Sequence, residues 1–187
     1  MENPLISVCV FCGSRDGAKP AYREVALETG ALLARKGWRL VFGAGDKGIM
    51  GAVADATRAA GGSTLGVIPT HLLGHERRVG TAPDLIVTET MHERKKVMFT
   101  NSDAVAILPG GAGTLDEFFE GLTWAQLGLH SKPIFVVNTD GYWTKLVELL
   151  DHLIAEGFAD PSLRDFVFVV ANTEDLEAAL AAHFNGA

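Results

Sequence analysis

The stretch Ala104-Val105-Ala106-Ile107-Leu108-Pro109-Gly110-Gly111-Ala112-Gly113-Thr114-Leu115-Asp116-Glu117 decides the fold of this 187-residue chain. Its first five residues form an apolar run typical of a buried strand, and the apolar spacing from 115 to 127 predicts a helix. The glycine-rich turn between them lets the backbone approach a ligand closely. A helix N-terminus adds free N–H groups and about half a positive charge. The stretch therefore predicts a phosphate site.

The same stretch brings two carboxylates, Asp116 and Glu117, into the first helical turn. A phosphate site with an acid at its rim indicates chemistry on a phosphorylated small molecule. A structural interpretation stands beside this one, because Thr114 to Glu117 also fits the capping box Thr-x-x-Glu. In a capping box Glu117 would only fix the start of the helix. The stretch alone leaves both interpretations open.

The order of strand, turn and helix recurs along the chain. Apolar runs predict strands at 6–11, 38–42, 64–68, 85–88, 104–108, 133–137 and 166–170. Helical spacing predicts helices at 20–36, 49–60, 91–101, 115–127, 142–156 and 173–183, while 71–83 is irregular. Continuously apolar strands that alternate with helices indicate an α/β fold, a single doubly wound parallel sheet of the Rossmann-like kind with helices on both faces. No linker or repeat divides the sequence, so we expect one domain over residues 1–187.

Ligands of such sheets bind at the carboxyl ends of the strands. Glycine-bearing turns follow the first, second and fifth predicted strands, and we expect all three at that edge. The turn at 43–48 matches Gly-x-Gly-x-x-Gly, the dinucleotide fingerprint. The fingerprint also requires an acid near the end of the next strand, which here ends Gly66-Val67-Ile68-Pro69. The missing acid counts against NAD(P) and favours a mononucleotide pocket.

Composition narrows the classes of partner. The formal net charge is −7 and there is no long basic run, so we expect neither nucleic acid nor an anionic membrane as a partner. No apolar leader or membrane-length apolar run is present, which predicts a cytoplasmic protein. Cys9 and Cys12 are spaced C-x-x-C, but Cys9 lies inside the first strand, so we expect buried thiols and no redox pair. The six histidines show no ligand spacing, and we predict no metal and no cofactor.

A third polar cluster opens the helix predicted from Met91. Thr90 and Glu93 have the spacing of a capping box. Arg94 and Lys95 come just past the first turn, where the helix dipole disfavours positive charge. A solvated surface pair is the ordinary explanation. A nearby anion is the explanation we favour, because the pair lies at the ligand edge of the sheet.

Several motifs together resemble one known family, the LOG ("lonely guy") family of cytokinin riboside 5'-monophosphate phosphoribohydrolases, many of which were once labelled lysine decarboxylases. The resemblance covers nearly the whole chain and lies in Gly13-Ser14, Gly45-x-x-Gly48-Ile49-Met50-Gly51, Gly66-Val67-Ile68-Pro69, Met91-His92-x-Arg94-Lys95, Pro109-Gly110-Gly111-x-Gly113-Thr114-x-x-Glu117 and Thr123-Trp124-Ala125-Gln126-Leu127-Gly128. It implies hydrolysis of the N-glycosidic bond of N6-modified AMP, with AMP as a further candidate, to free base and ribose 5-phosphate. It also implies a homodimer.

The resemblance assigns roles residue by residue. Arg94 and Glu117 take the catalytic positions, and the substrate-binding positions fall on Glu76, Arg94, Lys95, Gly110, Gly111, Ala112, Gly113, Thr114, Leu115, Asp116 and Thr123, with Gly13, Ser14 and Gly45 added from the other turns. Three positions depart from the family pattern: Ala44 replaces a glycine, Ala112 a frequent aromatic residue, and Asp116 a glutamate. The last two bear on which base is preferred.

The chemistry of glycosidic cleavage fits these residues. Breaking a ribosyl C–N bond builds positive charge on the sugar, which an ionised Glu117 can stabilise while it orients the ribose hydroxyls or activates water. Arg94 is a poor proton donor, because a guanidinium group does not lose its proton in proteins, so its role is electrostatic and positional. The alternative is a nucleotide-binding carrier or sensor of the same fold without turnover, which would not need both residues. We find no lysine arrangement suited to pyridoxal chemistry, so the decarboxylase label has no support.

Overall fold

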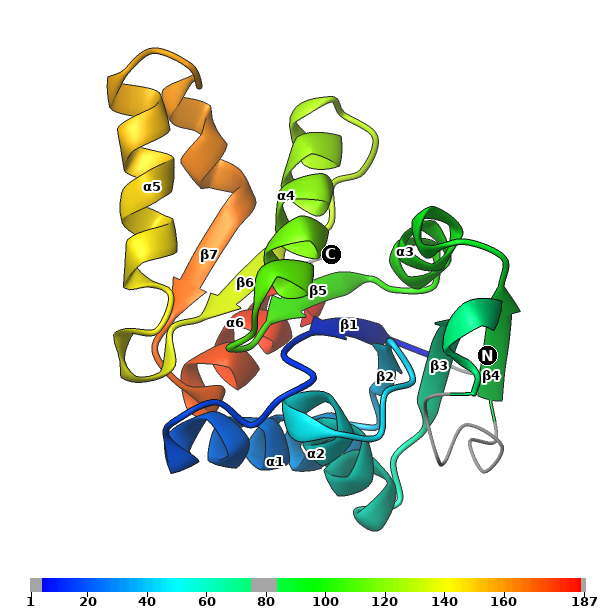
Figure 1. Cartoon of the computed structure of the whole chain (residues 1–187). Coiled ribbons are helices and arrows are strands. Elements are labelled where there is room, and N and C mark those ends of the chain that lie inside the picture. The colour runs from blue at the N-terminus through cyan, green and yellow to red at the C-terminus, as the bar shows by residue number, and fades with distance from the viewer. Residues whose placement is uncertain (1–4, 75–83, 186–187) are drawn as a thin grey trace.

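Seven parallel strands form one sheet at the centre of the molecule (Figure 1). The structure is a computed structural model that describes residues 5–74 and 84–185. The strands are β1 (Ser7–Phe11), β2 (Arg39–Phe42), β3 (Thr64–Pro69), β4 (Asp84–Thr88), β5 (Ala104–Ile107), β6 (Ile134–Val137) and β7 (Val167–Val170). Their order is β4-β3-β2-β1-β5-β6-β7, and every neighbouring pair is parallel. The predicted doubly wound α/β fold is confirmed.

Helices cover both faces of this sheet. Figure 1 shows α1 (Pro20–Arg35), α2 (Gly48–Ala59) and α6 (Thr173–Asn185) on one face. On the other face lie α3 (Met91–Thr100), α4 (Ala112–Gln126) and α5 (Thr144–Ala155). Val8 and Val10 of β1 pack in the first core, whereas Cys9 and Phe11 pack in the second. Because successive strand residues face different cores, the strands read as continuous apolar runs.

The chain changes direction across the sheet between β1 and β5. From β1 it winds outward through β2, β3 and β4, then returns to β5 on the other side of β1. Ligands of doubly wound sheets bind at such a switch point. Here the two loops touch, since the Gly13 N–H donates to the Pro109 carbonyl at 3.0 Å. A Cβ on Gly13 would lie 3.3 Å from the Gly110 Cα, so this close approach favours glycine.

One predicted boundary is wrong in a way that matters for function. α4 begins at Ala112, three residues before the predicted start, and its N-cap is Gly111. Thr114 therefore lies inside the first turn, and among the described residues no side chain caps this helix. The capping box Thr114–Glu117 does not form. The other predicted strand and helix boundaries agree to within two residues, and most of the irregular stretch 71–83 lies outside the described residues.

Candidate functional site

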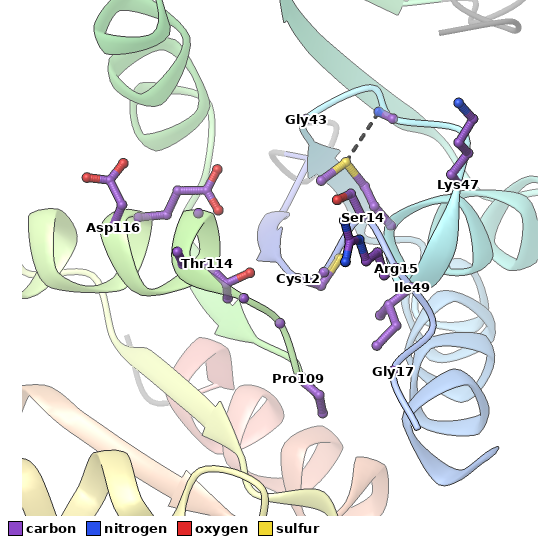
Figure 2. Close-up of a pocket in the computed structure, with 18 of the residues that line it drawn as sticks. Cys12, Ser14, Arg15, Gly17, Gly43, Lys47, Ile49, Pro109, Thr114 and Asp116 are labelled. Atoms are coloured by element: carbon purple, nitrogen blue, oxygen red, sulfur yellow. Dashed lines mark hydrogen bonds between the residues drawn. The ribbon is translucent and has the colours of Figure 1, made fainter. Parts of the chain in front are cut away.

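A pocket of about 1020 Å³ opens at the carboxyl edge of the sheet. Figure 2 shows its two walls: the segment from Pro109 to Asp116 faces the turns that follow β1 and β2, which carry Ser14 and Lys47. The start of α3 and the loop after β6 also contribute, through Met91, Arg94 and Tyr142. Glycine turns from three strands thus meet at one cavity, as the sequence predicts.

The glycine loop, Pro109–Thr114, presents backbone donors to this pocket. Gly111 to Thr114 all line it, and the first hydrogen bond of α4 runs from Leu115 N to Gly111 O. The N–H groups of Ala112, Gly113 and Thr114 have no acceptor within the helix, because a helix leaves its first amides unpaired. A Cβ on Gly111 or Gly113 would meet no atom within 4 Å. The loop therefore leaves room for an anion beside unpaired donors.

Glu117 projects from α4 into the pocket with only 7% of its surface exposed. Burial raises the pKa of this carboxyl, Arg94 lowers it and Asp116 raises it, and the result is about 7. A carboxyl with this pKa exchanges its proton near neutral pH, which general acid–base catalysis requires. Since the capping box is absent, Glu117 has no structural role at the helix start.

Arg94 is also buried, with 6% of its surface exposed, and it lines the same pocket. Its Nη2 donates to the Gly43 carbonyl at 2.9 Å and its Nε donates to the Val67 carbonyl at 3.1 Å. A Cβ on Gly43 would lie 1.6 Å from Nη2. Gly43 is therefore glycine because the guanidinium occupies the space beside it, and this accounts for the first glycine of the fingerprint without a dinucleotide.

Lys95, the neighbour of Arg94, points into a different environment. Its Nζ lies 2.9 Å from Asp116 Oδ2 and 2.6 Å from Glu120 Oε2, and 5% of the side chain is exposed. Burial alone lowers the pKa of Lys95, but its hydrogen bonds to Glu120 and Asp116 outweigh that effect and raise it. Lys95 therefore stays protonated, and its ion pairs with Asp116 and Glu120 link α3 to α4. The anion that the sequence predicts beside this cation is supplied by the protein itself.

Comparison with known proteins identifies the family of this chain. The profile of a family described as "Possible lysine decarboxylase" matches residues 50–180, which is most of the chain. The probable cytokinin riboside 5'-monophosphate phosphoribohydrolase LOGL9 of Oryza sativa subsp. japonica is 47% identical over 157 residues, 84% of this chain and 69% of that protein. The chain belongs to the LOG family. LOG7 of Arabidopsis thaliana, a cytokinin riboside 5'-monophosphate phosphoribohydrolase, is 41% identical over 169 residues, 90% of this chain and 78% of that protein.

Solved structures of proteins that carry or bind the molybdenum cofactor show the same fold. The molybdenum cofactor carrier protein of Chlamydomonas reinhardtii superposes with a TM-score of 0.73 at 23% identity, covering 95% of this chain and 97% of that one. The molybdenum cofactor binding protein of Rippkaea orientalis gives a TM-score of 0.70 at 24% identity, covering 98% and 99%. At this identity the likeness concerns the fold alone.

The pocket gathers most of the residues that the LOG resemblance assigns to the site. The predicted residues that line it are Gly13, Ser14, Gly45, Arg94, Gly110, Gly111, Ala112, Gly113, Thr114, Asp116 and Glu117. Lys95, Leu115 and Thr123, which belong to α3 and α4, do not line it, and Thr123 is exposed farther along α4. Glu76 lies outside the described residues.

Sequence reasoning missed one whole segment of the pocket wall, the loop after β6. Tyr142 lines the pocket, and its hydroxyl donates to the Gly110 carbonyl at 2.5 Å. Tyr22 of α1 lies against it, with ring centroids 5.1 Å apart. The only signal in the sequence is position, because Asn138-Thr-Asp-Gly-Tyr142 follows a strand at the ligand edge of the sheet.

Other expectations concern the cysteines, the start of α3, metal ligands and membrane spans. Cys9 and Cys12 are free and buried, as predicted, and burial raises the pKa of both thiols. Thr90 caps α3 by accepting from Glu93 N at 3.1 Å, as predicted, while the Glu93 carboxylate accepts from Glu89 N at 2.8 Å. Within residues 5–74 and 84–185, no three His, Cys, Asp or Glu side chains cluster as metal ligands. None of the helices in that part of the chain is both long and apolar enough to cross a membrane.

Proposed function

We propose that this protein hydrolyses the N-glycosidic bond of cytokinin riboside 5'-monophosphates, releasing the free base and ribose 5-phosphate. Relatives named for this activity match the chain at 47% and 41% identity. The observation that carries the proposal is the buried carboxyl of Glu117, free of any capping role, beside an open glycine loop and a buried arginine. AMP is the second candidate substrate.

The residues of the pocket have distinct roles in this hydrolysis. The N–H groups of the glycine loop hold the 5'-phosphate, and binding this remote group orients the reacting bond. Ionised Glu117 faces the sugar, stabilises the positive charge that develops at C1', and takes a proton from the attacking water. The new C1'–O bond replaces the C1'–N bond, the departing base takes up a proton from solvent, and Glu117 returns the proton it took from water to solvent. Arg94, fixed by two backbone carbonyls, supplies a preorganised positive charge that balances Glu117 and the departing base.

The remaining assigned residues act around this centre. Gly13, Ser14, Gly45 and Asp116 complete the pocket wall on the substrate side. Lys95 of α3 supports this wall by holding Asp116 in place, and Leu115 packs against the core beneath α4. A pyridoxal-dependent decarboxylase would need a lysine that loses its proton readily, whereas the two carboxylates keep Lys95 charged.

We also propose that the active form is a homodimer in the cytoplasm. Leu127 and Leu129, just beyond α4, expose 67% and 69% of their surface and offer apolar area for a second copy. Light scattering should give about twice the single-chain mass of 19.9 kDa. Two unpaired thiols suit a reducing compartment, and cell fractionation tests the location.

The decisive experiment measures base release. Purified protein is incubated with isopentenyladenosine monophosphate, AMP and the unphosphorylated riboside, and free base is quantified by liquid chromatography. We expect base from the prenylated monophosphate and none from the riboside, with Glu117→Gln binding nucleotide but releasing no base. Glu148→Gln, which changes an exposed glutamate of α5, is the matched control. Tight nucleotide binding by calorimetry without base release would instead support the carrier function.

A further inference from the structure

The loop after β6 holds the glycine loop through one hydrogen bond. Tyr142 follows the short 3₁₀ helix Thr139–Gly141, and its hydroxyl donates to the Gly110 carbonyl at 2.5 Å. We propose that Tyr142 is a positioning residue that orients the Gly110–Gly111 peptide, so that the glycine loop binds the phosphate group of the substrate. This inference rests on the proposed function, because it concerns how the same pocket holds a 5'-phosphate.

Three successive carbonyls of the glycine loop are each engaged by a donor. The Pro109 carbonyl accepts from Gly13 N at 3.0 Å, the Gly110 carbonyl accepts from Tyr142, and the Gly111 carbonyl accepts from Leu115 N at 3.1 Å. A carbonyl that turned toward a phosphate would repel it. With all three carbonyls engaged, the backbone groups of the glycine loop that remain available to an anion are the unpaired N–H groups at the start of α4.

The middle carbonyl needs an external donor more than the others do. The Gly110 carbonyl and the Gly111 N–H belong to one planar peptide unit and point in opposite directions, so fixing one fixes the other. With glycine on both sides, no Cβ resists rotation of this unit. The Gly13 bond and the first bond of α4 hold the units before and after it. The Tyr142 hydroxyl is the donor that holds the peptide unit between Gly110 and Gly111.

The ring of Tyr142 is itself held before any ligand arrives. It packs against Tyr22 and Trp143, with centroid distances of 5.1 and 4.7 Å, both in edge-to-face geometry. Trp143 is 4% exposed, and its backbone N–H donates to Asn138 Oδ1 at 2.7 Å. Asp140, in the left-handed region at φ 52°, pairs with Lys19 at 3.4 Å and ties the same loop to the start of α1. These contacts aim the hydroxyl without help from the substrate.

Tyr142→Phe removes the hydroxyl and keeps both ring contacts. Calorimetry on the full chain should show ribose 5-phosphate binding about fivefold to tenfold more weakly, the factor that one hydrogen bond is worth. The affinity for free isopentenyladenine should stay within about twofold, because the base carries no phosphate. In turnover, KM for the monophosphate should rise by the same factor as the ribose 5-phosphate Kd, with kcat nearly unchanged.

Thr144→Val is the matched control. It deletes a hydroxyl at the first residue of α5, one that accepts from Asn138 Nδ2 at 3.1 Å and does not touch the glycine loop, so wild-type affinities are expected. Unchanged ribose 5-phosphate binding in Tyr142→Phe, or equal weakening for phosphate and base, would overturn the inference. If the wild type releases no base, the proposed function fails, yet the binding comparison still decides the role of Tyr142. A wild type that binds neither ribose 5-phosphate nor inorganic phosphate would overturn both.

Discussion

Replacing Glu117 by glutamine tests whether the ionised, buried carboxylate of Glu117 lowers the free energy of unfolding. Burial raises the pKa of Glu117 from 4.5 to about 7, although Arg94 opposes the rise. Between these pH values the folded protein keeps a proton that the unfolded chain has already released, so the free energy of unfolding falls as the pH rises. Above pH 7 the accumulated loss is about 3 kcal/mol. Glutamine carries no charge and avoids this loss.

Urea unfolding at pH 5 and pH 8 measures the effect directly. Glu117→Gln should exceed the wild type by about 3 kcal/mol at pH 8 and by less than about 1 kcal/mol at pH 5, where the buried carboxyl keeps its proton. The exposed Glu148 of α5 serves as the control, since Glu148→Gln should change stability by less than about 0.5 kcal/mol at either pH. Equal or lower stability of Glu117→Gln at pH 8 would refute the reasoning. It would mean that Arg94 stabilises the carboxylate enough to offset its burial.

Three further predictions follow from the contacts of the site. The kcat/KM for the monophosphate should rise about tenfold from pH 6 to pH 8 as Glu117 ionises; a fall over that range would make Glu117 a proton donor instead. Gly43→Ala should lower kcat/KM at least about 100-fold, because the new Cβ would lie 1.6 Å from Nη2 of Arg94 and would displace that side chain. Gly74→Ala is the control and should keep wild-type activity, since its Cβ would meet no atom within 4 Å. Lys95→Met should lower the free energy of unfolding by about 2 kcal/mol, because it leaves the partly buried Glu120 carboxylate without its cation; wild-type urea unfolding would contradict this.

The parts of the fold that depend on local pattern were predictable. The inner strands β1, β2, β3, β5 and β6 are buried on both faces and therefore appear as unbroken apolar runs, which is the signature of a covered parallel sheet, whereas the edge strands β4 and β7 are partly exposed. The start of α4 was not predictable in this way. Ala112, Gly113 and Thr114 carry no amphipathic signal, and glycine is a poor helix former, so periodicity detects the helix only from Leu115. The Thr-x-x-Glu pattern then suggests a cap that lies in fact inside the first turn.

The long-range contacts of the site could not be predicted from spacing. Arg94 reaches carbonyls that lie 51 and 27 residues away along the chain, and only the folded sheet brings them together. The dipole argument correctly indicates negative charge beside Lys95, yet it cannot tell a bound anion from Asp116 and Glu120 on a neighbouring helix. The hydroxyl of Tyr142 bears on function only because β6 is the neighbour of β5.

Two adjacent cations explain why this site is rigid before substrate arrives. Arg94 points toward the sheet and is fixed by the carbonyls of Gly43 and Val67, whereas Lys95 points toward α4 and is fixed by two carboxylates. One turn of α3 thus fastens itself to the ends of β2 and β3 and to the helix that carries Glu117. The catalytic carboxylate of Glu117 and the Arg94 cation therefore keep one separation, and no protein rearrangement is needed as charge develops on the sugar. A carrier needs no such fixed pair, so this double anchoring favours turnover over storage of a nucleotide.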